Sequence, residues 1–550
     1  KYEGGFPLTE LQQSYFVGRQ EGILQGEIST HGYMEITVRK YSFNKVKETL
    51  SRMLSVHSSL RIYIDKQGVQ HIAETAEPDI YEYVTDSDKN METALSELRT
   101  ELNKKSVNIE KAPLFEVHCV TNGNGTAVVA FLTDNIVFDG ISSMLFINEF
   151  INIYSGKEET YQDTEYSFQD YVHYLSEIKG TPKYQSDKKY WLELSKNFPS
   201  VMNPPSISNA NYKAEPMYQY LDIPENIWNG ICGQSNYGGV SVFSFILTAV
   251  IQMLSREMYE NRFLISIPEE NRPSFDESFR NMLGEFSSFL LFPCSVNKDE
   301  SFLESAKRNQ KLLWKFKQHD SFSAIELMRE LNKSGGSAYS STVPVVFTSL
   351  LEQERQETQD IYLSHMRSYT TQISLEIVML KIRGNVRINF TYLSNILSDK
   401  TVIDMVSMLY STLEKAVQNP EIYVTPDLPS ADFKVIEEVN NTSKDTDFIT
   451  VREKLLQSFE KNAERTALAD FENKYSYRDI KKKSLCVSAE ILKKAENEKA
   501  VAVLMQKGIP QIIAIIGTVL SGKAYMPLEY GYPSERISAC LKNAGITTVI

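Results

Sequence analysis

Continuous and alternating runs of hydrophobic residues predict the strands of this chain. The segment YMEITVRK, residues 33–40, alternates hydrophobic and polar positions with a period of two, which is typical of a half-buried strand. The segment TAVVAFLTD, residues 126–134, is a continuous hydrophobic run rich in β-branched residues, as in the centre of a sheet. The same criteria predict further strands at residues 263–267, 287–296, 342–351, 370–380 and 385–393.

Hydrophobic residues recur at helical spacing in segments between these strands. NKVKETLSRMLSVH, residues 44–57, follows the first strand, and SSMLFINEFINIY, residues 142–154, follows the central one. Ser142 or Ser143 is a candidate N-cap of the second helix, because a serine hydroxyl accepts a hydrogen bond from an unpaired N–H of the first turn. Further helices are predicted at residues 168–178, 188–196, 240–258 and 399–417. Helices and strands together indicate an α/β fold.

A polar segment that contains prolines divides the chain. Three prolines fall between residues 418 and 448, which is typical of a linker, and we predict the linker itself at residues 421–448. Helical and strand-like segments then alternate again, which predicts an α/β domain with a parallel sheet at residues 449–550. The last residues, AGITTVI, are typical of a buried strand, and the first residue is not Met. We therefore expect both ends to be cuts from a longer polypeptide.

Composition and charge exclude several classes of protein. A chain of 550 residues fits about two to four domains, and 42% hydrophobic residues are typical of a globular protein. The net charge is −13 and no Lys/Arg cluster forms a stripe, so we expect no nucleic-acid partner. The five cysteines form no CxxC pair and the seven histidines no HExxH motif, so we expect free thiols, a cytoplasmic location and no metal site. The most apolar run, PQIIAIIGTVLSG, is too short to cross a membrane, and no membrane partner is expected.

The segment LTDNIVFDGIS, residues 132–142, places two carboxylates around a hydrophobic centre where burial is expected. Burying a charge is costly unless the charge is paired or hydrogen-bonded. Asp134 and Asp139 therefore have two interpretations. Each could hold an arginine or accept hydrogen bonds from backbone N–H groups at a strand end. Alternatively, each could serve in general acid–base catalysis.

The segment FPLTELQQSYFVGR, residues 6–19, resembles FPLTxxQxAYxxGR, the opening motif of heterocyclization domains of nonribosomal peptide synthetases. The one departure is a serine where alanine is usual. Heterocyclization domains also carry DxxxxDxxS, which Asp134, Asp139 and Ser142 match. Ordinary condensation domains carry HHxxxDG at this place, and the two histidine positions of that motif correspond to Asp134 and Asn135. The two acids therefore favour the heterocyclization subfamily.

Further segments resemble motifs of the same family, in the same order along the chain. They are VHSSLR (56–61), APLFEV (112–117), FLISIPEENR (263–272), GEFSSFLLF (284–292), PVVFTSLL (344–351) and TTQISLE (370–376). After the linker, YSYRDI (475–480) and LSGKAYMPLEYGYPSERI (520–537) resemble the start of an adenylation domain, with Glu529 where aspartate is usual. The phosphate-binding loop of that family lies beyond residue 550. ATP and Mg are therefore expected only in a complete adenylation domain, and we expect this fragment of it to be inactive alone.

The resemblance implies a fold and a reaction. The fold is two chloramphenicol-acetyltransferase-like lobes, residues 1–180 and 181–420, which form a V-shaped pseudo-dimer with a central tunnel, followed by a truncated α/β adenylation subdomain. The tunnel admits the 4′-phosphopantetheine arms of upstream and downstream carrier domains, and no cofactor is bound directly. An acyl or peptidyl thioester is condensed with carrier-bound Cys, Ser or Thr, and the product is cyclized and dehydrated to a thiazoline or oxazoline. The chain is expected to be a monomeric module of a larger synthetase.

The resemblance also implies site residues. The threonine of the family motif PVVFTS is Thr348, and the acid of TPQVWLD is Glu376, where the family has aspartate. Ring closure and loss of water require proton transfer, which a carboxylate beside a hydroxyl can perform. The predicted catalytic residues are Thr348, Glu376, Asp134 and Asp139. The predicted substrate-binding residues are Gln372, Ser142, Asn135 and Tyr15.

Several alternatives stay open. Glu376 reaches one methylene further than aspartate, and a displacement of about 1 Å can cost roughly a hundredfold in rate. The Trp and Pro of the same motif are also replaced, so the domain could condense its substrates without cyclizing them. A non-catalytic condensation-like module that recruits a partner is a third hypothesis, which predicts lost motif acids and a blocked tunnel. Tyr15, Asp134 and Asp139 could be structural, and Gln372 could be a buried structural amide.

Overall fold

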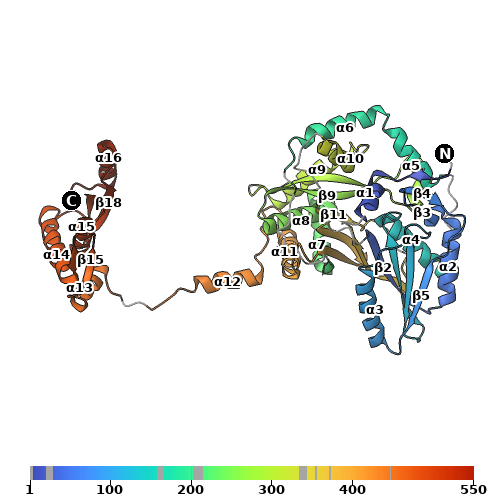
Figure 1. Ribbon diagram of the computed structural model, residues 1–550, viewed down its shortest axis with the longest axis horizontal. Helices are drawn as coiled ribbons and strands as arrows, with labels where there is room; N and C mark the ends of the chain where they lie inside the picture. Colours follow the sequence, from blue (N-terminus) through green and yellow to red (C-terminus); the bar gives the residue numbers. More distant parts are fainter. Residues whose placement is uncertain are drawn as a thin grey trace. The chain divides into compact units, whose positions relative to one another are not determined.

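The computed structural model describes residues 4–19, 29–157, 166–199, 201, 215–333, 343–353, 356–370, 373–445 and 448–550. The chain divides into two compact units, Lys1–Val435 and Ile436–Ile550, which are described separately (Figure 1). The first unit contains two lobes, each built on a β-sheet. The predicted boundaries at residues 180 and 421–448 stay predictions.

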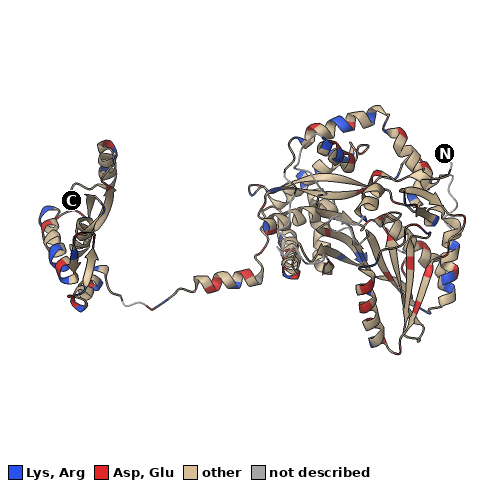
Figure 2. Ribbon diagram, viewed as in Figure 1, with Lys and Arg blue, Asp and Glu red and all other residues tan. Residues whose placement is uncertain are grey.

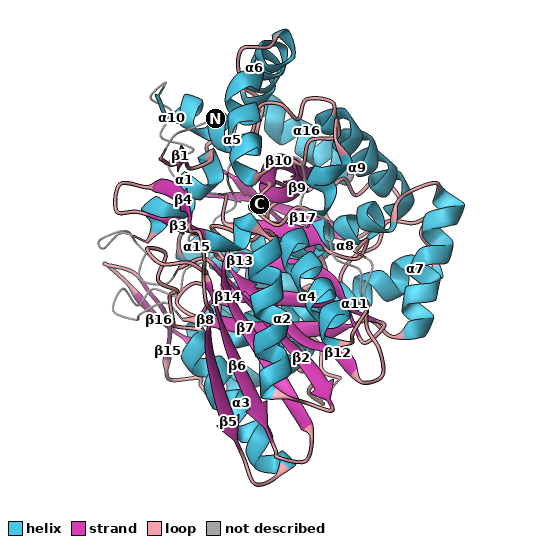
Figure 3. Ribbon diagram, turned by 90° about the vertical axis from the view of Figure 1, so that its right-hand side faces the viewer, coloured by secondary structure: helices cyan, strands magenta, loops and turns pink. Residues whose placement is uncertain are grey.

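The first lobe is built on a five-stranded sheet. Its strands, in spatial order, are β12 (Ile361–Tyr369), β2 (His31–Arg39), β7 (Thr126–Asp134), β6 (Phe115–Thr121) and β5 (Asp79–Val84). The predicted central strand is confirmed, since β7 lies in the middle of the sheet. The helices of this lobe are α1 (Glu10–Gly18), α2 (Phe43–Val56), α3 (Asp88–Leu102), α4 (Gly140–Tyr154) and α5 (Phe168–Ile178). Figure 3 shows β5, β6, β7 and β2 side by side, with α2 along one face.

Short elements complete the first lobe. A three-stranded sheet has the order β1 (Phe6–Pro7), β4 (Val69–Ile72) and β3 (Ile62–Ile64), with the 3-10 helix η1 (Ser58–Arg61) before β3. Because β1 pairs with β4, the start of the chain is held against the lobe at Phe6, directly before α1. The side chain of Thr9 accepts a hydrogen bond from the N–H of Gln12, which fixes where α1 begins.

The second lobe is built on a six-stranded sheet. Its strands, in spatial order, are β10 (Ser287–Ser295), β9 (Arg262–Glu270), β11 (Val345–Ser349), β13 (Leu375–Ile382), β14 (Asn385–Leu393) and β8 (Pro216–Asp222). Its helices are α6 (Pro182–Ser195), α7 (Glu225–Gly238), α8 (Val242–Met258), α9 (Phe302–Lys317), α10 (Ala324–Lys333) and α11 (Asp399–Gln418), and the 3-10 helix η2 (Glu277–Asn281) precedes β10. The strand β12 follows β11 in the chain but pairs with β2, so the chain crosses back to the first lobe.

Each lobe has its own hydrophobic core. In the first lobe, Phe131 and Phe146 pack edge to face, with ring centroids 5.4 Å apart. In the second, α8 is buried over most of its length and lies beside α11 and α9. Burying one large apolar side chain contributes about 1.5–3 kcal/mol, so the two cores stabilise their lobes. Among the described helices, none is by itself both long and apolar enough to cross a membrane; α7 and α8 satisfy the test only as a pair bent by 107°.

The structure corrects several expectations about individual elements. The N-cap of α4 is Asp139, whose carboxylate accepts the N–H of Ser142 at 2.5 Å, so the prediction of Ser142 or Ser143 as the cap is wrong. An aspartate caps as well as a serine does, and here it also meets an arginine. The helix predicted to begin at residue 188 begins at Pro182, where Thr181 accepts a hydrogen bond from the first turn. Among the strands of the two large sheets, β5, β6, β8 and β12 had no counterpart among the predictions.

The second unit is a small α/β assembly. Its elements are α13 (Val451–Lys461), β15 (Thr466–Ala469), β16 (Lys474–Ser476), α14 (Tyr477–Lys494), β17 (Ala500–Met505), α15 (Ile509–Leu520), β18 (Ala524–Glu529) and α16 (Ser534–Ala544). The pair β17–β18 is parallel, as predicted for this region, with α15 as the crossover helix. The helix α12 (Ser430–Asn440) lies within the predicted linker, and the boundary between the units falls inside it.

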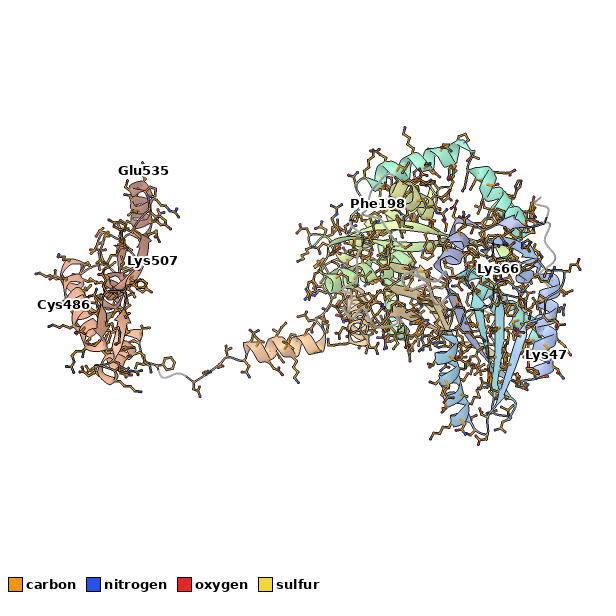
Figure 4. The ribbon with its side chains drawn as sticks, viewed as in Figure 1. Lys47, Lys66, Phe198, Cys486, Lys507 and Glu535 are labelled. Carbon is orange, nitrogen blue, oxygen red and sulfur yellow. The ribbon has the colours of Figure 1, made fainter. Side chains whose placement is uncertain are left out.

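Charged side chains of both signs lie on the described helices, whereas the cysteine thiols differ in burial. Figure 2 shows basic and acidic positions interspersed along α6 and α14, whereas acidic positions prevail on α3. All five cysteines are free thiols. The side chain of Cys486 projects outward from α14, as Figure 4 shows, whereas Cys119 and Cys294 are buried.

Candidate active site

A cavity of about 730 Å³ lies between the two lobes of the first unit, and we name it the inter-lobe cavity. Both sheets contribute to its wall. From the first lobe come Met34 on β2 and Arg367 on β12; from the second come Thr348 on β11 and Glu376 on β13. The predicted site residues Tyr15, Asn135 and Asp139 also line it. The fold therefore brings together residues that are more than 300 positions apart in the sequence.

Thr348 and Glu376 lie on the same face of the second sheet. The strands β11 and β13 are parallel, with Val346 opposite Glu376 and Thr348 opposite Val378. Because side chains two positions apart share a face, Thr348 and Glu376 are diagonal neighbours on the face that lines the cavity. The predicted pair is therefore adjacent in space, which is the arrangement needed for a carboxylate assisted by a hydroxyl.

The surroundings of Glu376 favour the neutral form of its carboxyl group. Its side chain is buried, 8% exposed, and this burial raises the pKa of Glu376 to about 7. Hydrogen bonds from Ser368 and Thr370 oppose this rise, and the hydroxyl of Ser368 donates to Oε2 at 2.8 Å. Because Ser368 lies on β12, the first lobe supplies the hydrogen bond that holds the carboxylate of the second. A carboxyl with a pKa near neutrality suits general acid–base catalysis.

Asp139 joins the lobes through an arginine. Its Oδ2 accepts a hydrogen bond from Nη1 of Arg272 at 3.0 Å and from the N–H of Phe286 at 3.1 Å. The side chains of Arg272 and Asp139 are both only 4% exposed. The guanidinium also lies over the ring of Phe286, 4.2 Å from its centroid. These contacts agree with the structural interpretation of Asp139, although the residue also borders the cavity.

Asp134 is fully buried and is not among the residues that line the inter-lobe cavity. It forms an ion pair with Arg19, and its Oδ1 accepts the N–H of Ile136 at 3.0 Å. Burial raises the pKa of Asp134, and the nearby Arg19 opposes that rise. The neighbouring Asn135 does line the cavity, and its N–H donates to the carbonyl of Thr30. These contacts favour a positioning role for Asp134, and its catalytic role stays a prediction.

Ser142 holds a loop of the second lobe. Its hydroxyl donates to the carbonyl of Gly284 at 2.7 Å and accepts from the N–H of Gly284 at 3.0 Å. It also accepts from Nη2 of Arg272 at 2.9 Å. Ser142 is fully buried and not among the lining residues. Its predicted contact with substrate, like that of Gln372, stays a prediction, and Gln372 itself lies outside the described residues.

Tyr15 lies among the acids of the cavity. Its side chain projects from α1, is 8% exposed and lines the cavity. Burial raises the pKa of Tyr15 well above its ordinary value, and the carboxylates of Glu285 and Glu376 raise it further. The hydroxyl therefore stays protonated and can donate a hydrogen bond to a carbonyl oxygen or a carboxylate.

The cavity is also lined by residues that were not predicted, and Glu285 and Ser368 are the two whose chemistry bears on the site. Glu285 is buried and lines the cavity; it stands in the segment GEFSSFLLF, so its motif was visible but its role was not. Ser368, the partner of Glu376, lies on the strand β12, for which no pattern signal was found. Among the described residues, no three His, Cys, Asp or Glu side chains are grouped so that they could hold a metal ion.

The comparison with protein families gives the class of this two-lobed α/β unit with a cavity between its sheets. Residues 3–433 match the condensation domain family, and residues 455–550 match the AMP-binding enzyme family. The chain therefore belongs to the condensation domain family and continues into the start of an AMP-binding domain. It is a condensation-type domain of the kind found in nonribosomal peptide synthetases.

Two relatives and two solved structures illustrate the similarity. The chain is 24% identical over 545 residues to bacitracin synthase 1 of Bacillus licheniformis. The matched region is 96% of this chain and 10% of that protein. It is 20% identical over 557 residues to phenyloxazoline synthase MbtB of Mycobacterium sp. (strain MCS), which covers 98% of this chain and 47% of the relative. The chain thus spans less than half the length of these relatives.

The solved structures share the fold. The nonribosomal peptide synthetase FmoA3 has a TM-score of 0.79 at 19% identity, covering 99% of this chain and 57% of its own. The match with the EpoB cyclization-docking bidomain of Sorangium cellulosum has a TM-score of 0.68 at 22% identity. It covers 76% of this chain and 85% of the bidomain. The predicted fold, two chloramphenicol-acetyltransferase-like lobes followed by a truncated adenylation region, is confirmed by these neighbours.

Proposed function

We propose that this condensation-type domain is a heterocyclization domain. It joins a carrier-bound acyl or peptidyl thioester to carrier-bound Cys, Ser or Thr, then cyclizes and dehydrates the product to a thiazoline or oxazoline. The observation that carries the proposal is the buried Glu376 beside Thr348 in the inter-lobe cavity. Two relatives support it by name, a phenyloxazoline synthase and a cyclization bidomain. The acid and amide at Asp134 and Asn135, where condensation domains carry two histidines, support it further.

The chemistry begins with amide formation. The amine of the acceptor attacks the donor thioester, and the thiol of the donor arm leaves. The side-chain thiol or hydroxyl of the acceptor then attacks the new amide carbonyl, which closes the ring and places a negative charge on the carbonyl oxygen. Glu376 as a carboxylate takes the proton of the attacking group and then gives it to the charged oxygen, which becomes a hydroxyl group. The Thr348 hydroxyl orients the carboxylate or the substrate. The neutral Tyr15 hydroxyl lies in the same cavity and is suited to donate to the developing oxyanion.

The reaction requires partners that bring both substrates. Upstream and downstream carrier domains would deliver them on 4′-phosphopantetheine arms, which act here as parts of the substrates. The cavity has walls from both lobes and a volume of about 730 Å³, which is within the usual range for a small-molecule site. ATP and Mg would serve only a complete adenylation domain. We expect the chain to act as a monomeric module of a larger synthetase.

A second candidate is a domain that condenses without cyclizing. The longer side chain of Glu376 and the replacement of the family tryptophan by Ser374 favour it, because both change the geometry of the pocket. A non-catalytic recruitment module is less well supported, since large side chains of the described residues do not fill the cavity and the motif acids are present.

The test is the mass of the acceptor carrier after reaction with the whole chain. One carrier is loaded with a simple acyl group, and another with cysteine, serine or threonine. Gain of the acyl group with loss of one water supports heterocyclization. Gain of the acyl group without water loss for all three acceptors supports condensation alone. No transfer from several donors supports the recruitment module. In the first case, Glu376→Gln is expected to form the amide and to lose water at least about a hundredfold more slowly.

A further inference from the structure

A second buried carboxyl group faces the inter-lobe cavity. Glu285 lies between η2 and β10, is 2% exposed, and borders the cavity with Glu376. Its Oε1 accepts the N–H of Ser287 at 2.8 Å, which leaves Oε2 to meet a molecule in the cavity. The hydroxyl of Tyr15 lies within electrostatic reach of both Glu285 and Glu376, and all three side chains line the inter-lobe cavity. The chemistry described above does not use Glu285.

The backbone on both sides of Glu285 is held by the two motif residues Asp139 and Ser142. The N–H of Phe286 donates to Oδ2 of Asp139, and the N–H of Asp139 donates to the carbonyl of Gly284 at 3.2 Å. The hydroxyl of Ser142 bonds both the N–H and the carbonyl of Gly284. The motif DxxxxDxxS of the first lobe therefore fixes the position of an acid that belongs to the second lobe.

The charges around Glu285 favour its neutral form. Burial raises the pKa of Glu285 well above its ordinary value, and the carboxylate of Asp139 raises it further; the N–H of Ser287 and the charge of Arg272 oppose this rise. Among the described residues, Glu285 also acts electrostatically on Tyr15 of α1 and Tyr171 of α5, and both stay protonated because burial raises the pKa of each. A neutral carboxyl group beside a reacting molecule is a proton donor.

We propose that Glu285 is the proton donor for the loss of water in this cavity, positioned by Asp139 and Ser142. The inference rests on the proposed heterocyclization. In this step the ring N–H proton passes to Glu376, and the N–H electron pair forms the C=N bond. The C–O bond breaks with its electron pair on the hydroxyl oxygen, which takes the proton of Glu285 and leaves as water. Proton return from Glu376 to Glu285 through solvent restores both groups.

The test uses the whole chain and the carrier-bound acyl and cysteinyl substrates. Glu285→Gln is expected to form the amide at the wild-type rate and to lose water at least about a hundredfold more slowly. In this variant, part of the product that has gained the acyl group but has not lost water should resist thiol alkylation. The reason is that ring closure has already consumed the cysteine thiol. Glu285→Asp retains a carboxyl group and should recover part of the rate. Glu352→Gln is the matched control, since Glu352 also borders the cavity but is exposed.

The pH profile separates a proton donor from a structural residue. In the wild type, the rate of water loss should fall on the alkaline side as Glu285 loses its proton, and Glu285→Gln should remove that fall. Water loss by Glu285→Gln at the wild-type rate would overturn the inference and leave the proposed function intact. Equal slowing of amide formation and water loss, not recovered in Glu285→Asp, would assign Glu285 a structural role. A wild-type chain that loses no water with any acceptor would overturn both proposals.

Discussion

Replacing Arg272 should show how much its polar contacts between the two lobes contribute to the stability of the first unit. The guanidinium contacts the buried carboxylate of Asp139 at 3.0 Å, the hydroxyl of Ser142 at 2.9 Å and the carbonyl of Met282 at 3.0 Å. It also covers the ring of Phe286. Arg272→Met retains much of the apolar length of the side chain and removes the charge with every donor. The variant therefore tests the polar contacts at nearly constant volume.

The expected loss follows from what remains around Asp139. Breaking a buried ion pair by removing one partner costs about 3–5 kcal/mol, because the other charge stays buried. Asp139 keeps two backbone donors, the N–H groups of Ser142 and Phe286, so its carboxylate is not left without partners. We therefore expect Arg272→Met to lower the free energy of unfolding by about 3 kcal/mol, the lower end of that range.

Tryptophan fluorescence during denaturant unfolding measures this change. The three tryptophans, Trp191, Trp228 and Trp314, all belong to the first unit, so the signal from the whole chain reports on that unit. A double-mutant cycle with Asp139→Asn isolates the pair, and we expect a coupling energy of about 2 kcal/mol. A coupling energy below about 0.5 kcal/mol, with unchanged dependence on denaturant, would refute the reasoning.

Three further changes test other parts of the first unit. The raised pKa of Glu376 makes the stability of the wild type fall as pH rises from 4.5 to about 7. The free energy of unfolding of Glu376→Gln, measured by the same fluorescence, should therefore increase relative to that of the wild type by about 3 kcal/mol over this interval. A difference that does not change with pH would contradict this. Ser368→Ala removes a hydrogen bond that lowers the pKa of Glu376. The pH below which the rate of water loss falls should therefore rise by about one unit, and an unchanged pH profile would exclude that contact. Gly238→Ala places a Cβ 2.2 Å from Cδ1 of the buried Leu303 and should destabilise the unit by about 1–3 kcal/mol in thermal unfolding. Gly233→Ala on the same helix, with nothing within 4 Å, is its control and should be neutral or stabilising.

The central elements of the fold were predictable because their patterns are regular. The strand β7 is a continuous apolar run, and its predicted limits, residues 126–134, are those observed. The strand β12 has no such pattern, since a bulge between Leu363 and His365 breaks its period of two. Its polar Arg367 lies between the rings of Tyr33 and Tyr218, 4.7 and 4.5 Å from their centroids, and these long-range contacts cannot be read from local sequence.

The candidate site was predictable only in part, for the same reason. Thr348 and Glu376 followed from motifs, and the parallel pairing of their strands places them together. Whether Asp139 meets solvent, substrate or Arg272 depends on a contact across 133 positions of sequence. The role of Glu285 depends in turn on Asp139 and Ser142, which hold its loop. The sequence motifs therefore identified the acidic residues, whereas the role of each one depends on contacts that only the folded structure shows.

The crossing of β12 into the first sheet has a consequence for how the chain is assembled during synthesis. Strands β2, β7, β6 and β5 are complete once residue 134 has emerged from the ribosome, yet β12 ends at Tyr369. Until then β2, which is almost wholly buried in the finished sheet, exposes an open edge of unpaired backbone groups. More than 200 further residues must therefore be synthesised before β12 can pair with this edge. A first lobe produced without β12 would expose an unpaired strand edge to which another chain could bind.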